Sequence, residues 1–191
     1  MGHRFQPSRR ALMALAAGAV AGLSAGTGRA ATRLGDDGLY VQDWYVESFL
    51  DLKEDLAAAT AHGKHFAIQW SQRGCPLCKR LHTEYFADPA IEGPIKAGFD
   101  IVHLDLFGSR EVTWFDGATA SEKALGTRLG IRATPTFQFF ALEGGEAKEV
   151  ARMPGLLPKP EFAAMFRYVA EGGSALGSFP DWLAKQAGPK G

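Results

Sequence analysis

The chain has 191 residues, enough for one domain with a hydrophobic core and additional terminal segments. Its apolar fraction of 46% and charged fraction of 22% are typical of an ordinary globular protein. The formal net charge is zero, and no basic patch stands out along the sequence, so nucleic acid is not expected as a partner.

Residues 1–30 have the composition of an export signal. Three arginines precede an uncharged apolar run, residues 11–25, which is shorter than the ~20 residues of a membrane span. Small residues follow, and we place the cleavage site after Ala30. The stretch SRRALM is similar to a twin-arginine signal but lacks its phenylalanine and lysine, so both export routes stay open, as does an uncleaved anchor. Cleavage and export predict a periplasmic protein, in an oxidising compartment.

The elements predicted after this signal begin with a mixed segment, residues 31–47. A helix follows, with Ser48 as its N-cap and Gly63 as its stop. The remaining pattern has the order β-α-β-α-β-β-α. Its strands are predicted at 65–70, 99–107, 134–142 and 146–155, and its helices at 78–87, 121–130 and 159–173.

This order predicts an α/β fold in one domain, residues 31–172, preceded by the signal and followed by a tail, residues 173–191. Helical crossovers link the first three strands, which predicts parallel or mixed strands in one covered sheet. The last two strands are separated by a short Glu-Gly-Gly turn, and they form an antiparallel hairpin at the sheet edge.

Cys75 and Cys78 are the only cysteines of the chain, and three chemistries use their spacing: a structural disulfide, half of a metal site, or a redox pair. So short a loop removes little entropy from the unfolded chain, which argues against a purely structural disulfide. The pair lies where a strand passes into a helix, and a helix N-terminus stabilises a thiolate. Cys75 is therefore the expected nucleophile and Cys78 the resolving thiol, with Pro76 in the first helical turn.

From about Ser48 to Gly172 the chain resembles the thioredoxin fold, with a central mixed sheet, flanking helices and a C-terminal hairpin and helix. FAIQWSQRGCPLCKRLH is similar to the strand–Cys-x-x-Cys–helix signature, and LGIRATPTF to the loop that carries the family's cis-proline. The resemblance implies a thiol–disulfide oxidoreductase whose only cofactor is its own Cys75–Cys78 disulfide. Substrate binding then falls to four residues: Thr134, Pro135, Pro76 and Leu77.

Several stretches, among them CPLCKRLH and GSREVTWFDG, are similar to the periplasmic SoxW-type thioredoxins of bacterial sulfur oxidation. That resemblance implies a reductant of periplasmic protein disulfides, with the SoxYZ carrier protein as client. It also implies a membrane thiol carrier of the CcdA or SoxV type as electron donor.

The sequence departs from ordinary thioredoxin at Gln69, which takes the place of a buried aspartate that assists proton transfer there. For proton transfer or pKa tuning we consider Gln69 itself together with His82, His103 and Glu84.

Two other functions stay open. A periplasmic disulfide oxidase or isomerase with a DsbA-like reduction potential would share all of these motifs. A non-enzymatic metal chaperone would use Cys75, Cys78 and His82, although no second Cys-x-x-Cys completes a zinc site, and no metal is expected.

Overall fold

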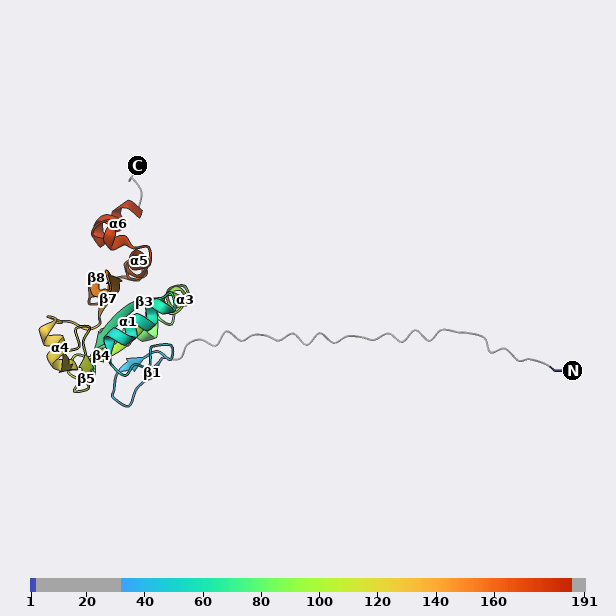
Figure 1. The fold of residues 1–191 in the computed structure, drawn as a ribbon, viewed down its shortest axis with the longest axis horizontal. Coiled ribbons are helices and arrows are strands. Elements are labelled where there is room, and N and C mark those ends of the chain that lie inside the picture. The colour runs from blue at the N-terminus through green and yellow to red at the C-terminus, as the bar shows by residue number, and fades with distance from the viewer. Residues whose placement is uncertain (3–31, 187–191) are drawn as a thin grey trace.

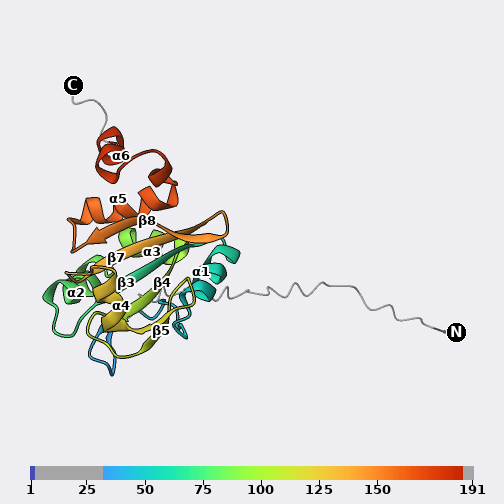
Figure 2. The same cartoon turned by 60° about the vertical axis from the view of Figure 1, so that its left-hand side comes forward.

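A four-stranded mixed sheet forms the centre of the computed structural model, which describes residues 1–2 and 32–186. The predicted cleavage site and apolar run lie outside the described residues. The strand order is β4-β3-β7-β8, and Figures 1 and 2 show the strands side by side. β3 (His65–Ser71) is parallel to β4 (Phe99–Asp105) and antiparallel to β7 (Thr136–Glu143), and β7 forms a hairpin with β8 (Glu146–Pro154). The prediction of an α/β fold with a mixed sheet is confirmed.

The strand register brings the two sequence motifs to one edge of the sheet. Trp70, near the end of β3, pairs with Thr136 at the start of β7. The loop that follows β3 and the loop that precedes β7 therefore lie next to each other. Six consecutive residues of β3 are buried, because helices cover both faces of the sheet.

Two hydrophobic clusters fill the space between the sheet and its helices. On one face, α3 (Pro89–Gly98) and α5 (Lys159–Ala170) contribute to a cluster rich in phenylalanine. On the other face lie α1 (Leu52–Ala61) and α4 (Glu122–Arg128), whose apolar residues pack with Trp70. In Figure 2, α5 lies along β8 and α6 lies beyond α5.

The helix that carries the cysteines is not a regular α-helix throughout. α2 (Pro76–Arg80) passes into a π-helical turn, η1 (Leu81–Tyr85), in which the N–H of Phe86 donates to the carbonyl of Leu81 at 3.0 Å. The sequence analysis missed α3, which contains Gly93 and Pro94. Asp88 caps α3 by accepting from the N–H of Ala90, and a proline occupies its first turn.

The first helix begins later than predicted. Asp51 is the N-cap of α1, since its side chain accepts from the N–H groups of Lys53 and Glu54. The prediction of Ser48 as the cap is wrong: Ser48 Oγ accepts from the N–H of Leu50 at 2.7 Å, in a turn ahead of the helix. The stop was correctly placed, since α1 ends at Ala61, two residues before Gly63 with φ of 69°.

Between β4 and α4 the chain forms a small hairpin of β5 (Glu111–Thr113) and β6 (Thr119–Ser121), which the sequence pattern did not reveal. Buried Glu122 fixes the hairpin to the sheet. Its carboxylate accepts from the N–H of Asp105 at 2.8 Å and from the N–H of Arg110 at 3.2 Å, and it pairs with the Arg110 guanidinium at 2.6 Å.

The described residues on either side of this domain, 32–50 and 171–186, pack against it. The N-terminal segment holds a short hairpin, β1 (Arg33–Leu34) with β2 (Tyr40–Val41), and then runs beside β4, where the N–H of Val46 donates to Ile101 at 3.1 Å. Beyond α5, a turn η2 (Gly173–Ala175) leads into α6 (Phe179–Gln186), which lies in the predicted tail.

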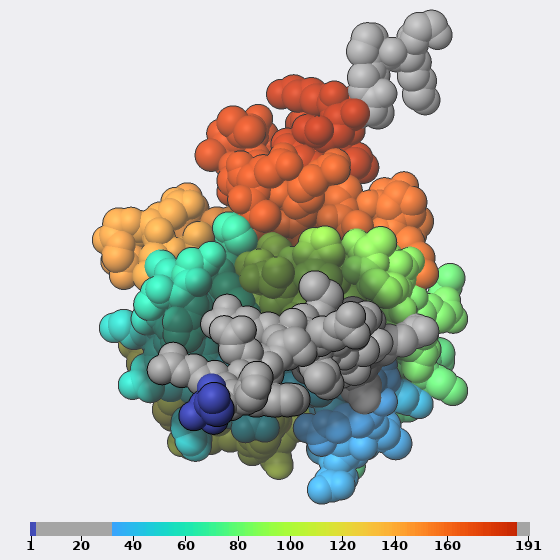
Figure 3. Space-filling view, turned by 90° about the vertical axis from the view of Figure 1, so that its right-hand side faces the viewer, coloured from blue at the N-terminus to red at the C-terminus, as the bar shows by residue number. Residues whose placement is uncertain are grey.

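The buried Trp182 of α6 packs on Tyr168 of α5. Figure 3 shows the N-terminal segment in blue at one end of the molecule and the C-terminal helices in red at the other. In the part of the chain that the structure describes, no helix is long and apolar enough to cross a membrane.

Candidate redox site

Cys75 is the N-cap residue of α2, and Cys78 lies one turn further along the helix. The sulfur of Cys75 accepts from the N–H of Cys78 at 3.1 Å, which is the capping interaction of this helix. Both cysteines are free thiols, and they are 6% and 2% exposed. Leu77, between them, is 43% exposed. The helix therefore presents Leu77 outward, while both cysteines are buried.

The loop before β7 lies directly against Cys75, although it is 59 positions away in the sequence. The peptide bond between Thr134 and Pro135 is cis, as the resemblance implied. The Cys75 thiol donates to the Thr134 carbonyl at 3.4 Å, and the Thr134 hydroxyl donates to the Cys75 sulfur at 3.3 Å. The loop is fixed in turn by the N–H of Gly155, which donates to the Pro135 carbonyl at 2.8 Å.

The two thiols have different surroundings. Burial and the hydrogen bond with Cys75 raise the pKa of Cys78 to about 11, against smaller opposing effects of the Ser71 and Thr134 hydroxyls. Cys78 is therefore a thiol at neutral pH. The Cys75 sulfur receives a backbone N–H and the Thr134 hydroxyl, and donors of this kind stabilise a thiolate. This asymmetry suits Cys75 as the attacking sulfur and Cys78 as the resolving one.

Four polar residues form a buried group near the redox helix, which we call the polar cluster: Gln42, Tyr45, Gln69 and His82. The Tyr45 hydroxyl donates to Gln69 Oε1 in a short hydrogen bond. Gln69 Nε2 lies 3.2 Å from His82 Nε2, and Gln42 Nε2 lies 3.2 Å from His82 Nδ1. Gln69 Nε2 also donates to Ser71 Oγ at 3.5 Å. Two side-chain amides thus enclose the imidazole of His82.

The polar cluster is uncharged at neutral pH. Burial, with a smaller effect of His103, lowers the pKa of His82 to about 3. Burial, followed by the charge of Cys78, raises the pKa of Tyr45 well above its usual value. His103 packs against both rings, and burial lowers its pKa to about 4.

The structure brings some of the predicted site residues together and separates one. Gln69 and His82 belong to the polar cluster, and His103 lies beside it with Nε2 buried and unpartnered among the described residues. Glu84 lies on the exposed side of the helix and pairs with Arg80 at 2.9 Å. The sequence analysis missed Tyr45, which belongs to no motif and lies 24 positions before its partner Gln69.

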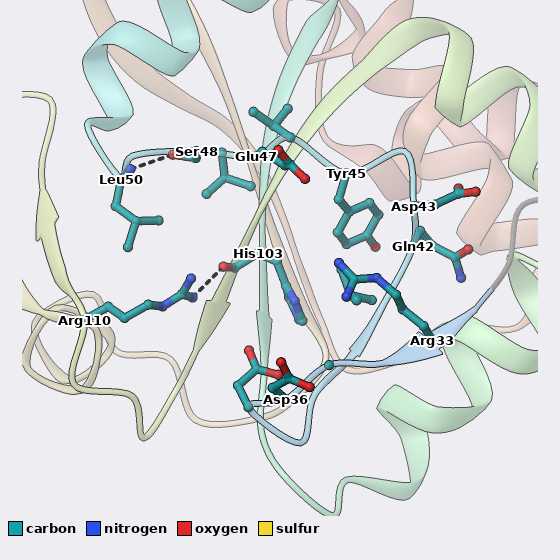
Figure 4. Close-up of a pocket in the computed structure, with 15 residues that line it drawn as sticks. Arg33, Asp36, Gln42, Asp43, Tyr45, Glu47, Ser48, Leu50, His103 and Arg110 are labelled. Carbon is teal, nitrogen blue, oxygen red and sulfur yellow. Dashed lines mark hydrogen bonds between the residues drawn. The ribbon is translucent and has the colours of Figure 1, made fainter.

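A cavity of about 390 Å³ opens behind the polar cluster. Figure 4 shows Tyr45 and His103 among the residues that line it, with Arg110 donating to the His103 carbonyl at 3.0 Å. Across residues 1–2 and 32–186, the structure contains no group of three or more His, Cys, Asp or Glu side chains placed to hold a metal ion.

Two cysteines at a helix N-terminus, facing a cis-proline loop at one edge of a mixed sheet, are the arrangement of the thioredoxin-like class of proteins. Residues 52–170 match the thioredoxin-like domain family, and the chain belongs to that family. No curated protein gives a significant match to the chain.

Solved structures agree with this assignment. A thioredoxin from Thermus thermophilus is 28% identical over 67% of this chain and 90% of its own, with a TM-score of 0.51. A thioredoxin-fold protein from Helicobacter pylori, 18% identical over 65% of this chain and 80% of its own, has a TM-score of 0.53 and supports the fold.

Proposed function

We propose that the protein is an exported thiol–disulfide oxidoreductase that reduces disulfides, or mixed disulfides, of periplasmic client proteins. The observation that carries the proposal is the Cys75 sulfur, which receives the Cys78 N–H and the Thr134 hydroxyl at the start of α2. Such a sulfur is stabilised as the nucleophile of thiol–disulfide exchange. Leu77, partly exposed beside it, offers an apolar contact to the client.

The reaction proceeds in two exchanges. The Cys75 thiolate attacks one sulfur of the client disulfide, a bond forms between Cys75 and that sulfur, and the other client sulfur leaves as a thiolate. Cys78 then loses its proton and attacks Cys75, which releases the second client thiolate and leaves a Cys75–Cys78 disulfide. Two electrons pass to the client, and its two thiolates take up two protons. A dithiol donor must then reduce the protein again.

The location, client and donor belong to this proposal. The arginine-rich, apolar composition of residues 1–30 supports export to the periplasm. The resemblance of CPLCKRLH and GSREVTWFDG to SoxW-type thioredoxins supports a sulfur-oxidation role, with SoxYZ as client and a CcdA- or SoxV-type membrane thiol carrier as donor.

A second function, disulfide oxidase, is favoured by the Thr134 hydroxyl. Its hydrogen bond to Cys75 stabilises the reduced dithiol, and a more stable reduced form makes a disulfide more oxidising. A proline directly after the first cysteine, here Pro76, is a feature of glutaredoxins and of DsbA, and both have higher reduction potentials than thioredoxin. The same dithiol then accepts electrons from client thiols instead of donating them.

The deciding experiment equilibrates the Cys75–Cys78 pair with glutathione and reads its redox state by thiol alkylation. A potential below about −200 mV supports the reductant, whereas one near about −120 mV makes the protein an oxidant.

Exchange itself is tested with Cys78→Ser, which should accumulate a mixed disulfide at Cys75 in a periplasmic extract. Cys75→Ser is the matched control and should accumulate none. If neither variant forms an adduct, the exchange function is wrong.

A further inference from the structure

We propose that the loops around the two cysteines form a basic surface, which selects client proteins that carry acidic residues beside their disulfide. We call this surface the basic face. It consists of two exposed apolar and four exposed basic residues: Leu77, Phe107, Arg73, Lys79, Lys123 and Arg132. The inference rests on the proposed function, for which it names the class of client.

The strand register brings the loop after β4 next to the loop that leads to Cys75. The N–H of Leu106, just after β4, donates to the carbonyl of Ser71, the last residue of β3, at 2.8 Å. The start of α4 joins the same surface, because the N–H of Lys123 donates to the carbonyl of Gly108 at 3.1 Å. Figure 2 shows α2 and α4 at the same end of the sheet.

The loop before β7 completes this surface on the other side of Cys75. It carries Arg132 two positions before Thr134, whose carbonyl and hydroxyl both contact the Cys75 sulfur. Arg73 precedes the cysteine pair, and Lys79 follows it directly. The four basic residues therefore come from three separate segments of the chain. For this reason no run of basic residues marks the surface in the sequence.

The acidic residues of the same region are paired or buried. Glu84 pairs with Arg80 at 2.9 Å, and Glu122, 1% exposed, pairs with Arg110 at 2.6 Å. Asp105 is 8% exposed, and its carboxylate accepts from a backbone N–H of its own loop at 3.0 Å. Among the described residues, the four basic residues of the basic face form no ion pair. Their charges are therefore available to a client.

The N-terminal hairpin lies beside the basic face and reduces its charge without cancelling it. A Cβ on Gly38 would lie 3.5 Å from Arg73 Cγ, so the side chain of Arg73 packs on the turn of this hairpin. Asp36 and Asp37 lie in that turn, and Arg33 lies in the first strand. These three residues contribute one excess negative charge, against four positive charges on the basic face. The surface around the thiols therefore stays positive.

The apolar part of the basic face supplies the contact that the charges surround. Leu77 is 43% exposed and Phe107 is 64% exposed. A cavity of about 240 Å³ lies between the two loops, with Arg73 and Phe107 among the residues that line it. Protein interfaces combine such an apolar centre with a polar rim. Charges at the rim raise the rate of encounter and exclude partners of like charge, while they add little to the lifetime of the complex. That combination suits a protein that must release each client after exchange.

The test uses three short peptides, each with one cysteine in a mixed disulfide with thionitrobenzoate. The cysteine lies beside a phenylalanine and between two glutamates, two lysines or two glutamines. The Cys75 thiolate attacks the peptide sulfur, a bond forms between these two sulfurs, and thionitrobenzoate leaves as a coloured thiolate with the electron pair of the broken bond. Stopped flow gives the second-order rate constant of this step. Each value is divided by the rate constant of the same peptide with dithiothreitol, which removes differences in intrinsic reactivity.

We expect the wild-type protein to prefer the acidic peptide. At about 0.01 M salt its normalised rate should exceed that of the basic peptide about tenfold, with the neutral peptide between them. At about 1 M salt, where the Debye length is about 3 Å, the ratio should fall close to one.

Charge reversal on the basic face should weaken this preference. Lys123→Glu and Arg132→Glu should each lower the acidic-to-basic ratio about threefold. Because both peptides are measured on the same variant, a change in the reactivity of Cys75 cancels in the ratio. Lys96→Glu is the matched control: it reverses an exposed charge on α3 just before the start of β4, whereas the basic face lies at the end of β4. Its ratio should equal that of the wild-type protein.

The apolar contact is tested separately with Phe107→Ser. This variant should slow all three peptides about threefold and leave their ratios unchanged, and a fourth peptide with alanine in place of phenylalanine should keep its wild-type rate. Equal normalised rates for the acidic and basic peptides would overturn the basic face. So would a ratio that falls as much in Lys96→Glu as in Lys123→Glu. A reduced wild-type protein that releases no thionitrobenzoate from any peptide would instead refute the proposed exchange function.

Discussion

The buried imidazole of His82 and the half-buried one of His103, whose Nε2 atom is buried, should make folding stability fall steeply in mild acid. Their pKa values in the folded protein are about 3 and about 4, against about 6.5 in an unfolded chain. Below about pH 6.5 the unfolded chain therefore binds protons that the folded chain does not, and stability decreases as the pH falls. At about pH 5 each ring costs about 2 kcal/mol relative to about pH 8, or about 4 kcal/mol together.

His103→Leu isolates one of these two contributions. Nε2 of His103 has no hydrogen-bond partner among the described residues, so the substitution removes a titrating group without removing a bond to that atom. We expect the loss of stability between about pH 8 and about pH 5 to fall from about 4 to about 2 kcal/mol. Urea unfolding at the two pH values, followed by circular dichroism, measures this difference. Burial raises the pKa of Asp55, so protonation of this carboxyl makes folding more favourable as the pH falls. This contribution is the same in the wild-type protein and in His103→Leu, and it does not affect their difference.

His62→Gln is the matched control, because the side chain of His62 is 69% exposed. Its unfolding free energy should follow the wild-type pH dependence. If His103→Leu instead loses as much stability between about pH 8 and about pH 5 as the wild-type protein, His103 is not held neutral by burial, and the reasoning fails. A wild-type protein whose stability changes by less than about 1 kcal/mol over this range would refute it for both rings.

Three further predictions follow from the packing and the thiols. In the reduced protein, the alkylation rate of Cys78 should rise about tenfold per pH unit up to about pH 11, because burial raises the pKa of this thiol. Site-resolved mass spectrometry measures this rate, and a rate that levels off near neutral pH would contradict the prediction. Glu122→Ala should cost about 2 to 4 kcal/mol in urea unfolding, since two backbone N–H groups lose their acceptor; a loss below about 1 kcal/mol would count against it. Gly126→Ala should lower the free energy of unfolding by about 1 to 3 kcal/mol, because a Cβ there would lie 2.7 Å from the Leu106 side chain. In Gly93→Ala the new Cβ meets open space, so this variant should be neutral or stabilising. Equal unfolding midpoints for the two variants would contradict this difference.

The sequence predicts those parts of the fold that depend on local signals. The spacing of Cys75 and Cys78 after an apolar strand marks the redox helix, and the Thr134–Pro135 pair marks the loop that meets it. The sequence pattern did not predict α3, which contains Gly93 and Pro94, while the tertiary packing of Ile91 and Ile95 stabilises the helix. At α3, burial of an apolar helix face therefore outweighs low local helix propensity.

The residues of the polar cluster also differ in whether the sequence predicts them. His82 was accessible to sequence reasoning, because a residue four positions after Cys78 lies on the same face of a helix. Tyr45 and Gln42 were not, since they contact Gln69 and His82 across 24 and 40 positions and belong to no motif. Their place depends on how the N-terminal segment crosses the domain, which no periodicity encodes.

The contacts of the N-terminal segment also limit how far the chain can be truncated. The family match begins at residue 52, but Thr32 donates to the His82 carbonyl at 2.8 Å and the N–H of Val46 donates to Ile101. A fragment trimmed to the family boundary would open one side of β4 to other chains and admit water to the imidazole of His82. Such a fragment should aggregate readily, so expression of a working protein requires the chain from about residue 32 onward.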